Sequence, residues 1–163
     1  MGNRAEGIAI VLGPEDGESY WQPQPSRGYV INKINPYTSP YDDFSVGIQV
    51  LGPGAHIRRH AHERSRELLF CFRGTGSAEI AGETFDVREE TMVLIGRGLQ
   101  HKVTNTGSEQ MRLLWLISPP GLEDCRAVGR PRRAGDPMPP VFERPANIKE
   151  IQAQQRFIAS DEG

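Results

Sequence analysis

The chain of 163 residues lacks several features that would place it in a class at once. Two cysteines, Cys71 and Cys125, are too few for a disulfide scaffold and fit a reducing compartment. The longest apolar runs, such as residues 113–117, are far too short to cross a membrane. The first residues, MGNRAEG, lack the apolar core of a signal peptide. We therefore expect a cytoplasmic protein without a membrane partner.

The sequence also lacks an excess of charge of one sign. It has 19 Lys and Arg against 21 Asp and Glu, which gives a formal net charge of -2. The one dense basic run, residues 129–133, contains proline and glycine and is predicted to be a solvated loop. We therefore expect no nucleic-acid partner.

What the chain does contain is a series of short β-rich runs separated by turn residues. This spacing is typical of an all-β sandwich or barrel. The Ala81-Gly82-Glu83 stretch is predicted to be a tight turn between two of the strands. The runs cover residues 7–12, 29–34, 44–51, 67–72, 77–82, 84–87, 91–96, 101–105 and 111–118.

The composition changes after residue 118. Residues 119–145 are rich in proline, glycine and arginine and show no strand alternation. Residues 121–128 are compatible with one or two helical turns, and residues 147–159 with a short helix that has Asn147 as its N-cap. We expect a single domain over residues 1–163, with a core barrel at about 28–118 and a C-terminal arm, 119–163, that acts as its lid or collar.

Three of the four histidines fall within seven positions, and two of them, His60 and His62, have the spacing of neighbours on one face of a strand. Glu67 begins the next apolar run, and His101 opens a later one. Three imidazoles and one carboxylate form a ligand set that suits a divalent Fe, Mn, Co, Ni, Cu or Zn ion. A His-x-His pair alone is a weak signal, since histidines without a metal are common.

The spacing around these residues resembles the two motifs of the cupin superfamily. The first motif is matched by Gly54, His60, His62, Glu67 and Gly74, and the second by Gly98, His101 and Asn105. Gly96 stands where that family usually has proline, and Glu90 where it has glycine, so the departures affect turns and leave all four ligand positions filled. The resemblance implies a cupin double-stranded β-helix, or jelly-roll barrel, that binds one divalent metal ion.

Four protein ligands leave one or two coordination positions open, as a catalytic site requires. The residual positive charge favours an anionic oxygen ligand, for which the metal acts as a Lewis acid. The C-terminal composition resembles that of quercetin-dioxygenase-type cupins, which implies an oxygenase (dioxygenase) acting on a small enolic or phenolic substrate. Isomerase or lyase chemistry, and a non-catalytic small-molecule-binding cupin, remain as alternatives.

Several residues near the ligands are candidates for further roles. Glu67 is either a permanent ligand or, as the resemblance to flavonol dioxygenases implies, a general base. His56 is an even number of residues from His60, so regular alternation along a strand would place both side chains on the same face. His56 is therefore either inside the barrel, as a proton shuttle, or at an exposed strand end. Arg58 is a candidate for binding the anionic substrate, and Leu69 and Cys71 for lining the pocket. A homodimer is expected by resemblance, because a partner would cover open β edges.

Overall fold

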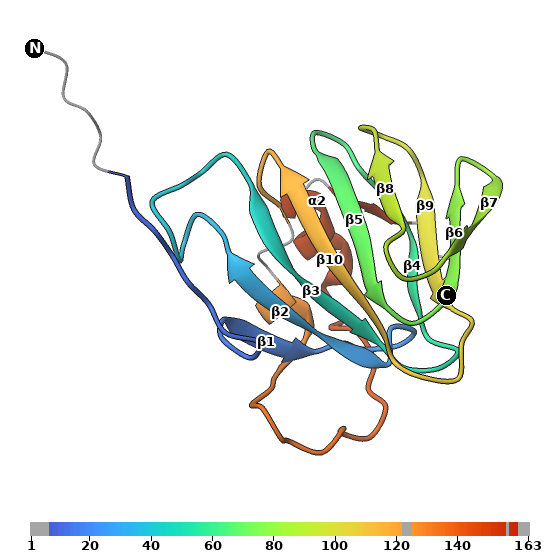
Figure 1. Cartoon of the computed structure of the whole chain (residues 1–163). Coiled ribbons are helices and arrows are strands. Elements are labelled where there is room, and N and C mark those ends of the chain that lie inside the picture. The colour runs from blue at the N-terminus through green and yellow to red at the C-terminus, as the bar shows by residue number, and fades with distance from the viewer. Residues whose placement is uncertain (1–6, 122–124, 156, 160–163) are drawn as a thin grey trace, which may run out of the picture.

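The computed structural model describes residues 7–121, 125–155 and 157–159, and within them two antiparallel sheets face each other (Figure 1). The strand order is β11-β1-β2-β3-β10-β5-β8 in the seven-stranded sheet and β12-β4-β9-β6-β7 in the five-stranded sheet. Neighbours in the chain often lie in different sheets, as in a jelly roll, so the predicted all-β jelly-roll barrel is confirmed.

The strands of the two sheets have the following bounds. The seven-stranded sheet contains β1 (Glu18–Trp21), β2 (Gly28–Ile34), β3 (Ser45–Leu51), β5 (Arg66–Arg73), β8 (Met92–Ile95), β10 (Met111–Ser118) and β11 (Arg130–Pro131). The five-stranded sheet contains β4 (His56–His62), β6 (Gly76–Ile80), β7 (Glu83–Val87), β9 (His101–Asn105) and β12 (Phe157–Ala159). The two helices are α1 (Cys125–Val128) and α2 (Ile148–Gln155).

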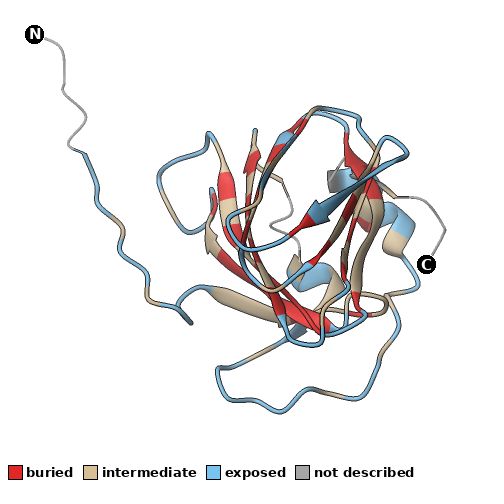
Figure 2. Ribbon diagram, turned by 45° about the vertical axis from the view of Figure 1, so that its right-hand side comes forward, coloured by how far each residue is buried: buried red, intermediate tan, exposed pale blue. Residues whose placement is uncertain are grey.

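The core lies between the two sheets, and β10 shows why the sequence places it there. Its side chains alternate strictly between buried and half-buried along the strand, which is the period of two expected for a strand with one face inward. Leu113, Trp115 and Ile117 are on the buried face and pack with residues of β5, β8 and β9. Buried segments are accordingly found on the strands around the interior (Figure 2).

The predicted turn between β6 and β7 is confirmed. Ile80 pairs with Glu83, so only Ala81 and Gly82 connect the two strands. Both residues have positive φ angles, 51° and 88°, as a two-residue type I′ hairpin turn requires. Glycine adopts this conformation without strain, which is why the sequence predicts the short turn at this position.

Three expectations about the ends of the chain need correction. Residues 7–12 were predicted as a strand but form none, and Val11 is 92% exposed. The predicted helix over residues 147–159 stops at residue 155, and residues 157–159 form β12, which pairs with β4. The seven-stranded sheet also extends beyond residues 28–118, because β1 and β11 pair with each other and β1 pairs with β2.

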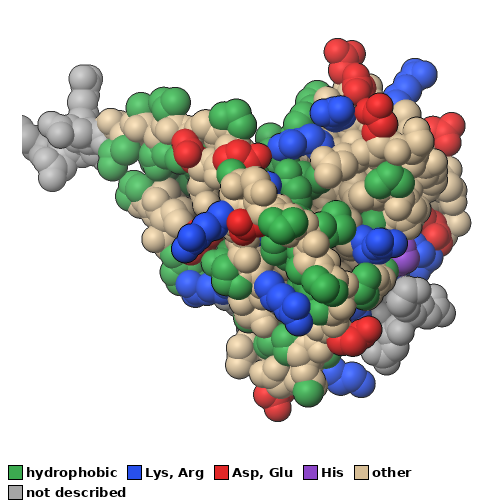
Figure 3. Space-filling model, turned by 90° about the horizontal axis from the view of Figure 1, so that it is seen from below, with side chains coloured by type: hydrophobic (Ala, Val, Ile, Leu, Met, Phe, Trp, Pro, Cys, Tyr) green, Lys and Arg blue, Asp and Glu red, His purple; other side chains and the backbone are tan. Residues whose placement is uncertain are grey.

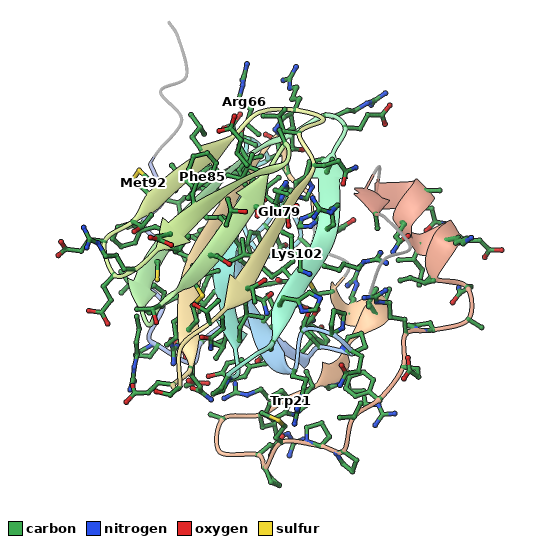
Figure 4. All side chains as sticks on the ribbon, turned by 90° about the vertical axis from the view of Figure 1, so that its right-hand side faces the viewer. Trp21, Arg66, Glu79, Phe85, Met92 and Lys102 are labelled. Atoms are coloured by element: carbon green, nitrogen blue, oxygen red, sulfur yellow. The ribbon has the colours of Figure 1, made fainter. Side chains whose placement is uncertain are left out.

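The C-terminal arm is docked on the outside of the seven-stranded sheet through its arginines. The guanidinium of Arg132 lies 3.7 Å from the ring centre of Tyr29 and 5.5 Å from that of Trp21, and Arg130 lies 4.1 Å from the ring centre of Phe142. Figure 4 shows Trp21 beside this part of the chain. These cation–π contacts and the short β1–β11 pairing attach the arm to the barrel.

The surface carries charges of both signs. On the face drawn in Figure 3, Lys and Arg side chains are interspersed with Asp and Glu. This agrees with the formal net charge of -2. Neither of the helices among the described residues has the length and apolar character needed to cross a bilayer.

Candidate metal centre

The four residues predicted as metal ligands lie together inside the barrel. His60 and His62 are on β4, His101 is on β9, and Glu67 is on β5 of the opposite sheet. Each of the four is buried, with exposed fractions from 1% to 7%. One potential ligand atom from each residue lies within 4.8 Å of those of the other three. Both sheets therefore contribute to a single cluster of three imidazoles and one carboxylate.

A bulge in β4 decides which histidines face this cluster. Ile57 pairs with Val103 and His60 pairs with His101, so β4 has one more residue than β9 between the two pairs. The extra residue reverses the alternation, and Ile57 shares the inner face with His60. His56 precedes the bulge and pairs with Thr104 on the other face. The parity argument that placed His56 inside the barrel is therefore wrong.

The surroundings of His56 agree with this outward position. Lys102 is on the same outer face, next to Glu79 of the paired strand β6 (Figure 4). Burial lowers the pKa of His56, and the positive charges of Lys102 and Arg144 lower it further. Burial and these two cations favour the neutral form of His56, which lies outside the ligand cluster.

Backbone hydrogen bonds orient two of the inner imidazoles. The Nδ1–H of His60 donates to the carbonyl oxygen of Arg58 at 2.8 Å, and the Nδ1–H of His101 donates to that of Leu99 at 3.0 Å. A carbonyl oxygen only accepts, so Nδ1 carries the proton in both rings. In the neutral form of each ring, the Nε2 atom presents a lone pair to the cluster, as in a metal-ligating histidine.

A carboxylate lies close to the Nε2 atoms of His101 and His62. The Oε2 atom of Glu67 lies 2.8 Å from Nε2 of His101 and 3.4 Å from Nε2 of His62. Burial alone would raise the pKa of Glu67, but the two imidazoles reverse this and hold its pKa well below the ordinary range. Burial would likewise lower the pKa of His101, and Glu67 raises it instead. Two acceptors this close need a cation between them, either a proton or a metal ion.

The third imidazole contributes no charge. Burial lowers the pKa of His60 well below the ordinary value, and the neighbouring His101 lowers it further. A neutral ring with a free lone pair is the form of histidine that binds a metal. Three nitrogen donors and one carboxylate oxygen fit a divalent transition ion of the Fe-to-Zn series, and the structure thus brings together all four of the predicted ligands.

The cluster opens onto a cavity of about 130 Å³. His60, Glu67 and His101 line its inner end, and the apolar side chains of Leu69, Val103 and Trp115 line its walls. The other side is lined by the loop at residues 22–26 and by residues of α1 and α2 of the C-terminal arm. In Figure 1, α2 lies on the far side of β3 and β10. The arm therefore covers the mouth of the barrel at this cavity.

The remaining predicted site residues divide into two groups. Arg58 and Leu69 line the cavity. Cys71 is 1% exposed and belongs to the hydrophobic core, where its thiol donates to the carbonyl oxygen of Arg73 at 3.4 Å, and it does not line the cavity. Burial raises the pKa of the Cys71 thiol, which fits an unreactive core residue.

The sequence interpretation missed the cavity residues that come from outside the two motifs. Gln22 lies in the loop after β1, Trp115 is on β10, and Arg144 and Gln152 belong to the arm. Only the alternation of β10 offered a signal, since it places Trp115 on the same inward face as Leu113. The others reach the cavity through tertiary packing that no local pattern indicates.

Comparisons with known proteins agree with this geometry. Residues 47–117 match the family described as "Cupin domain". The chain is 27% identical over 99 residues to "Polyketide synthase CurC" of Streptomyces cyaneus, covering 60% of this chain and 64% of that protein. It is 28% identical over 69 residues to "Tetracenomycin polyketide synthase protein TcmJ" of Streptomyces glaucescens, covering 42% and 46%.

The fold is shared with a solved structure. The "polyketide cyclase RemF" of Streptomyces resistomycificus superposes with a TM-score of 0.60 at 16% identity, over 69% of this chain and 80% of that one. At this identity the likeness concerns the fold alone. The match to the two curated relatives covers less than two thirds of their length.

Proposed function

We propose that this protein, which carries a cupin domain over residues 47–117, is a metal-dependent enzyme acting on a small enolic or phenolic substrate. The observation that carries the proposal is the position of the ligand cluster. His60, Glu67 and His101 form the inner end of a cavity, so an ion on the cluster would have at least one coordination position facing a bound molecule. A site that only stabilises the fold would be closed by protein ligands on every side.

A bound divalent ion would supply Lewis acidity toward an anionic oxygen, and with a redox-active ion also a route to O2 chemistry. His60, His62, Glu67 and His101 would hold it. The backbone carbonyls of residues 58 and 99 keep His60 and His101 in the required tautomer. The donor set is therefore preorganised, and little reorientation is needed when the ion binds.

Glu67 is the chain's candidate for moving the substrate proton. Its carboxylate lines the cavity, where it can reach a bound molecule. Oε2 would accept the proton of a hydroxyl, or of an acidic carbon between two carbonyls, and His101 at 2.8 Å would stabilise the resulting carboxyl group. The same side chain would act as a ligand between turnovers, so both roles considered for it belong to one cycle.

The walls of the cavity determine what else enters. Leu69, Val103 and Trp115 present an apolar surface that fits a ring or a planar enol and excludes water. Arg58, also in the lining, would bind an anionic oxygen that is not on the ion. The site thus combines an acid–base group, an apolar wall and a cationic contact around one small molecule.

For the reaction itself we propose oxygenation, in which both atoms of O2 enter the enolic or phenolic substrate. The curated relatives are named as polyketide synthase proteins. We therefore propose as a second candidate a bond-forming step on a poly-β-ketone, namely its cyclisation. Cyclisation would use the same proton removal by Glu67, but the new bond would form between two carbons of the substrate. The two candidates differ in one measurable respect, because only oxygenation consumes O2.

The test is O2 uptake by the protein loaded separately with Fe²⁺, Mn²⁺, Ni²⁺, Cu²⁺, Co²⁺ and Zn²⁺. Catechol and acetylacetone serve as simple phenolic and enolic probes. Uptake with a redox-active ion, lost in Glu67→Gln, supports oxygenation. Conversion without O2 uptake would instead favour cyclase, isomerase or lyase chemistry. Binding of both probes without turnover would reduce the protein to a binding module, and no binding by any loaded form would contradict the proposal.

Two properties expected from the sequence remain proposals. We propose a cytoplasmic location, for which Cys71 and Cys125, neither of which forms a disulfide, give support. We also propose a homodimer. The outer strand β8 of the seven-stranded sheet exposes Met92 to 62% and Leu94 to 70%, and a second copy would cover these side chains. Sedimentation velocity tests this, since a monomer at micromolar concentration would contradict it.

A further inference from the structure

We propose that Arg144 of the C-terminal arm binds a carboxylate group of the substrate at the arm side of the cavity. The inference rests on the proposed function of the same cavity and narrows its substrate class. The substrate would be an acid that carries its enolic or phenolic oxygens at one end, for the ion, and its carboxylate at the other.

The first observation is that Arg144 lines the cavity without a partner. It is half-buried, and it makes no hydrogen bond or ion pair with any described residue. Other arginines of the arm behave differently, since Arg130 stacks on Phe142 and Arg132 contacts Glu15 as well as two aromatic rings. Among the described residues of the arm, Arg133 also lacks a side-chain partner but is exposed to solvent, whereas the unpartnered guanidinium of Arg144 is half-buried and lines the cavity.

The second observation is the electrostatic situation of this guanidinium. Burial lowers the pKa of Arg144, and the opposing contribution comes from Glu143, its exposed neighbour in the chain. An arginine nevertheless stays protonated in proteins, so the cost of partial desolvation is not relieved by loss of the charge. The positive charge of Arg144 also acts on His56 together with that of Lys102. Arg58 lines the same cavity, so two cationic side chains border it, and an anion would be stabilised near them.

A second donor without a partner lies in the same lining. The Nε2 atom of Gln22 is buried and makes no hydrogen bond to any described residue. A buried amide hydrogen without an acceptor is costly, and such groups in folded proteins usually have a partner or bind a ligand. Arg144 and Gln22 come from opposite ends of the chain and converge on one cavity. Arg144 would supply the two parallel N–H donors of its guanidinium and Gln22 one further N–H, and a carboxylate can accept hydrogen bonds from all three.

The size of the cavity limits the remainder of the molecule. Its volume is about 130 Å³. A cavity of roughly 150 Å³ holds one benzene molecule, so this one has room for about one ring between the two polar ends. Trp115 and Val103 flank that space with apolar surface. The substrate class that results is a monocyclic phenolic acid or a short enolic acid of similar length.

The experiment compares two probes that differ only in the carboxylate. Catechol and 3,4-dihydroxybenzoate are titrated by calorimetry into the full-length protein loaded with Zn²⁺, a redox-inert ion that allows binding without turnover. We expect the acid to bind the wild-type protein about tenfold or more tightly than catechol, since a hydrogen bond to a charged group contributes at least that much. Arg144→Gln should remove this preference and leave catechol affinity unchanged.

Two further variants make the result specific. Arg133→Gln changes an exposed arginine of the same arm and should keep the full preference for the acid. Arg144→Lys retains the charge without the planar fork and should keep part of the preference. Thermal melts of each variant verify that the fold is intact, and Arg144→Lys provides the test if Arg144→Gln does not fold.

The outcomes separate this inference from the proposed function. Equal affinity of the wild-type protein for the two probes would overturn the inference and leave metal-dependent binding in place. So would a preference that survives Arg144→Gln but falls in Arg58→Gln, because the carboxylate would then bind Arg58. Failure of both probes to bind the Zn²⁺-loaded protein would instead contradict the proposed function.

Discussion

The two sides of the cavity are built in different ways. The inner end consists of side chains on paired strands, and its four candidate ligands are at most 7% exposed. The arm side consists of a loop and two short helices whose residues are mostly half-buried or exposed (Figure 2). Pairing of long strands fixes the end that holds the candidate ligands, whereas two short strand pairings and a few aromatic and polar contacts hold the arm. If the proposals made above hold, the barrel would supply the chemistry and the arm would select the substrate.

The largest expected effect is on the barrel side, in His101→Ala. Removing one imidazole should weaken Zn²⁺ or Co²⁺ binding by more than about 100-fold, since loss of a group behind a ligand alone costs about 10- to 100-fold. Metal titration with a competing chelator measures this. His56→Ala is the matched control, because the bulge places His56 on the outer face.

Two results would contradict the assignment of His101 to the ligand set and of His56 to the outer face. Full metal occupancy in His101→Ala would mean that the four residues are not the ligand set. Loss of metal in His56→Ala would mean that the outer histidine contributes to binding, against the register of β4 and β9.

A second effect concerns the stability of the barrel. Leu113 is 1% exposed in the core between the sheets, so Leu113→Ala should lower the free energy of unfolding by about 2–5 kcal/mol. Urea denaturation of the metal-free protein measures it. A decrease in the free energy of unfolding of less than about 1 kcal/mol would show that neighbouring side chains fill the space left by Leu113. That result would contradict a rigid packing around the candidate ligands.

The third effect concerns the arm. Arg132 stacks on Tyr29 and Trp21 and contacts Glu15 and Ser19, so Arg132→Gln should weaken docking of the arm by about 1 kcal/mol. Hydrogen exchange should become faster in α1 and α2 while exchange in β9 and β10 stays unchanged. Equal acceleration in strands and arm would show that the two regions open as one unit.

The smallest effect is expected at the barrel surface. Arg73 and Glu109 form an ion pair of 3.4 Å, with side chains 57% and 73% exposed. Arg73→Gln should change the free energy of unfolding by no more than about 0.5 kcal/mol, because solvent screens such pairs. Urea denaturation, run in parallel with Leu113→Ala, measures the change. A change above about 1 kcal/mol would contradict the expectation that this exposed ion pair contributes little to stability.

The sequence predicted the cluster of candidate ligands because three of the four, His60, His62 and Glu67, lie close together in the chain. Alternation along residues 101–105 and 111–118 gave two strands with the bounds seen in the structure. The spacing of His60, His62 and Glu67 depends on one strand, one turn and the start of the next strand. Such short-range patterns determine which side chains share a face.

The parts that were not predicted depend on long-range packing. The bulge in β4 places His56 on the opposite face of the strand from His60, and nothing in residues 56–60 indicates the extra residue. Residues 7–12 have the composition of a strand but pair with none of the described strands, while residues 157–159 read as the end of a helix yet pair with β4. Arg144 reaches the cavity only because the arm folds back, which composition alone does not indicate.

The most direct test of the central claim is elemental analysis of the protein purified without an affinity tag or added metal, followed by titration with Fe²⁺, Mn²⁺, Co²⁺, Ni²⁺, Cu²⁺ and Zn²⁺. The arrangement of His60, His62, Glu67 and His101 predicts close to one divalent ion per chain, either as purified or after titration. A protein that contains no metal and binds none of these ions would contradict metal binding by the four residues, and with it the proposed metal-dependent reaction.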